Sequence, residues 1–80
     1  MDEKELETWW ASLTVGQKER IAGKIVSKQT DGAVTTCNYP ECSRVWNDLP
    51  LERRQAIYEH CTDDHGFLLH KWREGFSFSY

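Results

Sequence analysis

The feature that most constrains this 80-residue chain is an apolar pattern that occurs twice, 36 positions apart. The first copy has bulky apolar residues at the i, i+3, i+4, i+7 spacing of an amphipathic helix: Leu6, Trp9, Trp10 and Leu13. A second apolar stripe follows over residues 15–28 and predicts a longer helix. Thr14 and Gln17 have the spacing of a capping box at its start.

A shift of 36 positions places an apolar residue at each position of the first stripe again. The equivalents of the first stripe are Cys42, Val45, Trp46 and Leu49. Pro50 then suits the first turn of a new helix, where its missing N–H costs no hydrogen bond. The equivalents of Val15, Ile21 and Ile25 are Leu51, Ile57 and Cys61.

The pattern therefore predicts two helical corners, each a short helix, a sharp break and a longer helix, over residues 6–28 and 42–61. Neither corner can bury its stripe alone, so we expect the two to pack face to face. The alternative is coincidence, because amphipathic helical hairpins in general share such spacing.

The C-terminal part of the chain predicts one more helix and a tail. Thr62 or Asp63 can cap a helix over about residues 63–73, which Gly75 would end. Residues 76–80 alternate apolar and polar, as a half-buried strand does. We expect this tail to lie extended over the domain, or to form a short β-ribbon with residues 33–36.

The predicted fold is a single all-α domain over residues 1–80, a small orthogonal bundle of about five helices with an extended aromatic tail. A hydrophobic content of 39% and a charged content of 29% are typical of globular proteins. No apolar run approaches the ~18 residues of a membrane-spanning helix. The acidic start lacks the pattern of a secretory signal, so we expect a cytoplasmic protein with free thiols.

Three cysteines and a histidine suggest a zinc site. Cys37, Cys42, Cys61 and His65 read C-x4-C-x18-C-x3-H, and zinc favours four such ligands. However, Cys42 and Cys61 occupy the positions that Leu6 and Ile25 fill in the first corner. Free cysteine behaves as a small hydrophobe, so we favour core thiols and no cofactor, with zinc as the alternative.

No pattern of residues predicts catalysis. Histidines and carboxylates occur together over residues 59–65, which is the raw material of acid–base chemistry. The same residues serve as caps and dipole partners at a helix junction, and no catalytic motif occurs in the chain. We therefore expect no catalytic residue and no enzymatic activity.

A basic stripe runs along the predicted second helix, where Arg20, Lys24 and Lys28 recur every four residues. Such a stripe can bind phosphates. A net charge of −3 and the neighbouring Glu19 weaken that interpretation, since phosphate binding needs a concentrated positive field. Weak nucleic-acid binding through this face remains an alternative to a simple solvated surface.

Aromatic residues supply the favoured functional prediction. Trp9 and Trp10 are adjacent, so on a helix only one of them can face the core directly. Trp9 corresponds to the smaller Val45, which marks it as the more exposed of the two. We expect a partner-binding patch of Trp9, Trp72, Phe76, Phe78 and Tyr80, because aromatic residues are favoured interface anchors.

The sequence thus predicts a small non-catalytic interaction or regulatory domain. Its partner would be another protein or a second copy of the chain, with no membrane partner. The alternative is that all of these rings close a small core, to which each contributes a large buried area.

Overall fold

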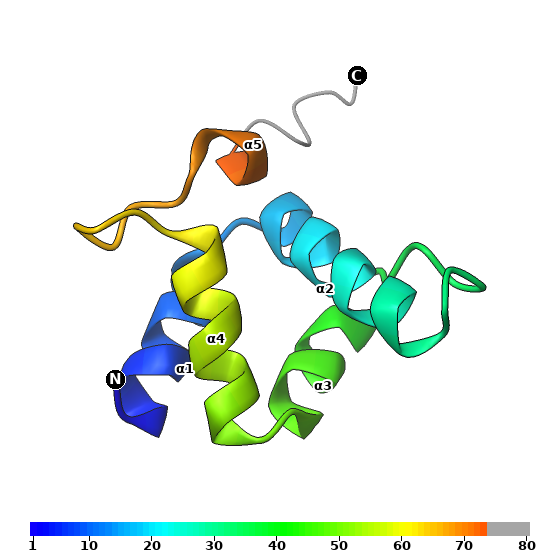
Figure 1. The fold of residues 1–80 in the computed structure, drawn as a ribbon, viewed down its shortest axis with the longest axis horizontal. Helices are drawn as coiled ribbons and strands as arrows, with labels where there is room; N and C mark the ends of the chain where they lie inside the picture. The colour runs from blue at the N-terminus through cyan, green and yellow to red at the C-terminus, as the bar shows by residue number, and fades with distance from the viewer. Residues whose placement is uncertain (74–80) are drawn as a thin grey trace.

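The computed structural model describes residues 1–73, which form five α-helices and no β-strand (Figure 1). The helices are α1 (Glu3–Ser12), α2 (Val15–Gln29), α3 (Glu41–Asp48), α4 (Leu51–Cys61) and α5 (His70–Arg73). This confirms the predicted all-α class. None of these helices combines the length and the apolar character needed to cross a bilayer. The predicted tail, residues 76–80, lies outside the described residues.

Local signals mark where α1, α2 and α4 begin. Asp2 and Glu5 form a capping box at α1, in which each side chain accepts the other residue's backbone N–H. Thr14 and Gln17 form the predicted box at α2, with hydrogen bonds of 3.0 and 3.1 Å. Pro50 occupies the N-cap of α4, where no N–H is required of it.

Several equivalent positions of the two predicted corners have matching environments, although Ile21 is buried and Ile57 only partly so. Leu6 and Cys42 are both 0% exposed, and Leu13 and Leu49 are both buried. Val15 and Leu51, which the apolar stripes assign to the core, are instead 48% and 43% exposed. Each is the first residue of its helix, and there the side chain points past the core.

Two tryptophans at equivalent positions join the corners. The rings of Trp10 and Trp46 stack with their centroids 4.7 Å apart and their planes 5° from parallel. The indole N–H of Trp10 donates to the Ser43 hydroxyl on α3. Around this stack α1 contacts α4, and α2 contacts α3 and α5 (Figure 1).

The connection between α2 and α3 passes directly over α2. At the crossing, a Cβ atom on Gly23 would lie 2.9 Å from the Thr35 carbonyl oxygen. The Tyr39 N–H donates to the Glu19 carboxylate at 2.7 Å, which attaches the far end of the connection to α2. Residues 33–36 form no strand within the described chain, so the predicted ribbon has no counterpart there.

The last helix is shorter than predicted. In place of a helix over 63–73, only His70–Arg73 is helical. The Asp63 carboxylate accepts the N–H groups of His65 and Phe67, which closes a turn in which Gly66 has a φ of +82°. The side chain expected to cap a helix therefore stabilises a reversal of the chain.

The reversal sets the position of α5. Thr62 and Leu68 form an isolated antiparallel bridge, and the Leu69 N–H donates to the Cys61 carbonyl at 2.8 Å. These contacts return the chain along the end of α4 and place α5 against α2 (Figure 1).

We predict that Gly23→Ala lowers the free energy of unfolding. The new Cβ would meet the Thr35 carbonyl oxygen, and overpacking of this kind costs about 1–3 kcal/mol. The greater helix propensity of alanine offsets about 1 kcal/mol of that cost. Urea denaturation measures the change, with Ser27→Ala on the same helix as the control. A Gly23→Ala protein as stable as that control would show that the connection can move away from α2.

We predict that Asp63→Ala lowers the melting temperature in a pH-dependent way. The N–H groups of Phe67 and His65 hold the pKa of Asp63 below its ordinary value of 3.8, so the folded state favours the ionised carboxylate. This stabilisation is fully present above pH 3.8 and is lost as the pH falls through the folded-state pKa. Thermal melts at neutral and acidic pH should show a difference that shrinks on acidification. A difference independent of pH would contradict this account.

Candidate functional site

Trp9 lies at the edge of the core and is half-buried. Its ring meets Tyr58 edge-on at 5.1 Å and lies 5.6 Å from the ring of Trp46. Both partners come from the second corner, so Trp9 extends the Trp10–Trp46 stack toward the surface. One of the five residues predicted for partner binding therefore contributes mainly to packing.

Trp72 is buried, which corrects the expectation of an exposed ring. It is 3% exposed because α5 lies against α2. The Arg20 guanidinium lies 5.8 Å and the Lys71 ammonium 5.1 Å from its ring centre, and the His60 ring meets it edge-on. The other three predicted aromatic residues, Phe76, Phe78 and Tyr80, lie outside the described residues. Of the five predicted residues, the structure describes only Trp9, which is half-buried, and Trp72, which is buried.

The candidate zinc ligands are not brought together. Within residues 1–73 no group of three or more His, Cys, Asp or Glu side chains could hold a metal ion. Cys42 and Cys61 are 0% and 1% exposed in the core, as their positions in the repeat predicted. His65 is exposed in the turn after α4.

The environments of the thiols disfavour thiolate chemistry. Burial raises the pKa of Cys61 to about 12. Burial also raises the pKa of Cys42, and the pKa of Cys37 is raised by burial and by the neighbouring Cys42 and Glu41. The thiolate is the form that attacks electrophiles, so these raised pKa values disfavour a nucleophilic role for the three cysteines.

A groove of about 370 Å³ lies between α2, α4 and α5. Lys24 and Lys28 come from α2, Arg53 from α4 and Lys71 from α5, and His60 adds a fifth basic side chain. The rest of the lining is almost entirely apolar: Ile21, Ile25, Ala56, Ile57, Cys61 and Trp72. Among the described residues, no Asp or Glu lines this groove, which we call the basic groove.

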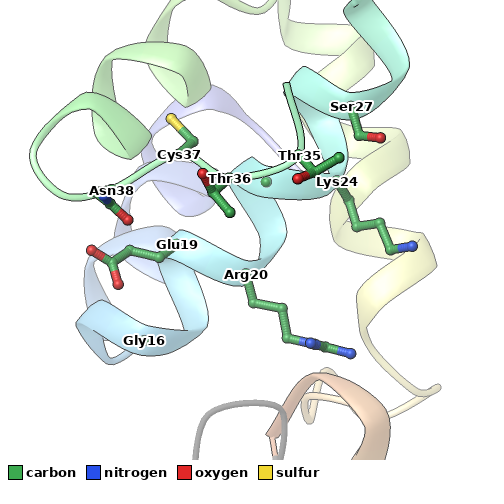
Figure 2. A pocket seen from close by; sticks show the side chains of 10 residues that line it. Gly16, Glu19, Arg20, Lys24, Ser27, Thr35, Thr36, Cys37 and Asn38 are labelled. Carbon is green, nitrogen blue, oxygen red and sulfur yellow. The ribbon is translucent and has the colours of Figure 1, made fainter. Parts of the chain in front are cut away.

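A second groove, of about 440 Å³, lies on the other side of the α2 basic stripe (Figure 2). It runs between α2 and residues 35–38, with Arg20, Lys24 and Glu19 on the helix wall. In Figure 2 Arg20 and Lys24 project together from α2, and Glu19 lies near Asn38 at the opposite end. An acid and two glycines in its lining make this groove less positive and less apolar than the basic groove.

The structure therefore divides the predicted basic stripe. Lys24 lines both grooves, Lys28 only the basic groove, and Arg20 only the second groove. In the basic groove, Arg53 from α4 and Lys71 from α5 join Lys24 and Lys28. The residue spacing along one helix could not reveal these two additions. The one available signal was the position of Arg53 in the first turn of the second corner's long helix.

The carboxylates near the end of α4 have structural partners. Glu59 accepts a hydrogen bond from the Gln55 amide at 2.9 Å, one helical turn away. Asp63 binds two backbone N–H groups of its own turn. These contacts support the interpretation of residues 59–65 as capping and surface groups.

Comparisons with protein-family models, curated proteins and solved structures find no match to this chain. Its function must therefore be argued from its own geometry.

We predict that native protein exposes one thiol to a labelling reagent. Cys37 is half-buried whereas Cys42 and Cys61 are enclosed, so a disulfide reagent at mildly alkaline pH should modify Cys37 first. The other two should react only as fast as the protein opens, and Cys37→Ser should abolish the early phase. A chelator that accelerates the labelling of Cys42 or Cys61 would instead support the zinc site.

Proposed function

We propose that this chain is a non-catalytic interaction domain that binds an acidic segment of a partner protein in the basic groove. The observation that carries the proposal is the convergence of Lys24, Lys28, Arg53 and Lys71 from three helices on a groove that no carboxylate of residues 1–73 lines. The chain has 13 acidic residues against 10 lysines and arginines, so this clustering runs against its net charge of −3.

Electrostatics favours an anionic ligand in such a groove. Like charges held close together repel, and the low-dielectric wall of a groove strengthens their combined field. A bound carboxylate relieves that repulsion and is attracted to several cations at once. The same field steers an acidic partner into place and speeds association.

A protein partner fits the groove better than a nucleic acid does. Single-stranded nucleic acids gain much of their affinity by stacking bases on aromatic faces. In the part of the chain that the structure describes, Trp72 is the one Phe, Tyr or Trp that lines the basic groove, and Arg20 and Lys71 lie over its buried ring. A groove with basic rims and an isoleucine floor is suited to acidic and apolar side chains.

The basic groove replaces the aromatic patch as the proposed binding surface. Among the described members of that patch, Trp9 packs on Trp46 and Tyr58, and Trp72 is covered. Nucleic-acid binding stays as the second candidate, because Arg20, Lys24 and Lys28 recur every four residues on α2 and Lys24 and Lys28 line the same groove.

We predict that selection from a displayed random-peptide library on the immobilised chain enriches acidic sequences. Lys24→Glu combined with Arg53→Glu should weaken the selected peptides by roughly tenfold or more, since each reversal replaces attraction with repulsion. Both residues are exposed, so the fold should be retained.

The matched control is Lys4→Glu combined with Arg44→Glu. It changes the net charge equally, on α1 and α3, away from the groove. Equal losses in the two variants would indicate a non-specific charge effect and contradict the proposed site. Absence of acidic enrichment, together with groove-dependent binding of a single-stranded oligonucleotide, would favour the nucleic-acid alternative.

A further inference from the structure

The floor of the basic groove is shaped for an apolar side chain. Ile21 and Ile25 lie one turn apart on α2, and Ile57 and Cys61 lie one turn apart on α4. These two apolar rows line opposite walls of the groove. On the α4 wall, Ala56 has only a methyl group and is exposed, so space remains above the floor.

The rim is built to hold charge beside that floor. Lys24 and Lys28 stand on the α2 wall, Arg53 stands on the α4 wall, and Lys71 comes from α5. Long basic side chains cover apolar surface with their methylene stems and keep the charged group at the surface. A ligand whose apolar group reaches the floor would therefore meet cations on more than one side.

Trp72 supplies a polar feature within this apolar setting. Trp72 lines the groove, and its buried indole Nε1 has no hydrogen-bond acceptor within residues 1–73. Buried donors are normally paired, and leaving one unpaired is costly.

From this geometry we infer that the partner segment carries one bulky apolar side chain flanked by carboxylates, and that this side chain anchors in the basic groove. The groove's volume of about 370 Å³ fits a single anchor better than a long apolar stripe. The inference rests on the proposed function, because it specifies the chemistry of the partner at the same site. The buried anchor side chain would add to the binding affinity an apolar contribution that charge attraction alone does not give.

The test uses three fluorescein-labelled peptides and the full chain, with fluorescence anisotropy at physiological ionic strength. The first peptide consists of Asp and Glu around one central Phe. The second has Ser in place of Phe, and the third has Asn and Gln in place of the acids. Replacing Phe with Ser should weaken binding to the wild-type chain by about tenfold or more, the expected effect of losing one buried aromatic side chain.

The protein variant that isolates the anchor is Ala56→Trp, which fills the space above the floor. It should reduce the affinity for the Phe peptide to that for the Ser peptide and leave the Ser peptide almost unaffected. Ala11→Trp, at an exposed alanine on α1, is the matched control and should change neither affinity. If Ala56→Trp fails to fold, the wild-type comparison of the Phe and Ser peptides still decides the question.

The outcomes separate the inference from the proposed function. If both acidic peptides bind equally well, and Lys24→Glu with Arg53→Glu weakens both, the proposed function stands and the apolar anchor is refuted. If neither acidic peptide binds, both are refuted. A selective loss of the Phe peptide in Ala56→Trp supports the anchor.

Discussion

The stack of Trp10 on Trp46 is the contact on which the rest of the fold depends. Its rings lie 4.7 Å apart and nearly parallel, and each comes from the short helix of one corner. Such a pair contributes about 0.5–1.5 kcal/mol beyond the area that it buries. A domain of this size has a small core and little stability in reserve, so losing the stack would weaken the packing between the two corners. Leu6 and Cys42, both fully enclosed, belong to the same core cluster.

The basic groove is a consequence of that packing. Once the short helices are joined, the long helices α2 and α4 both face the space that Ile21, Ile25 and Ile57 line. The side chains around its rim come from segments far apart in the sequence, which only the joined corners bring together. The groove would therefore not exist in either corner alone, and its charge depends on the integrity of the aromatic core.

Sequence reasoning succeeded where the structure is decided locally. Apolar spacing and the Thr14–Gln17 box identified the helices, and the repeat placed Cys42 and Cys61 in the core. It failed at Asp63, which could cap a helix or close a turn with equal local plausibility. The turn forms because the reversed chain also gains a hydrogen bond between the Leu69 N–H and the Cys61 carbonyl. That contact is distant in sequence and exists only after the chain has reversed. The same reversal buries Trp72 and carries Lys71 into the groove. Because the turn was predicted as a helix, neither of these two positions could be predicted from the sequence.

Binding at the groove and the docking of α5 are physically linked. α5 has four residues, and Trp72 is its buried member. The cation–π contact of Arg20, on α2, with Trp72 favours its docking by about 0.5–1 kcal/mol at a surface site. Docking also brings the Lys71 charge close to those of Lys24, Lys28 and Arg53. The repulsion among these like charges opposes the docking of α5. An anionic segment in the groove offsets the repulsion among these cations and leaves the contact of Arg20 with Trp72 in place. Ligand binding should therefore hold α5 more firmly on α2, and any ligand that prefers the docked form stabilises the folded chain by mass action.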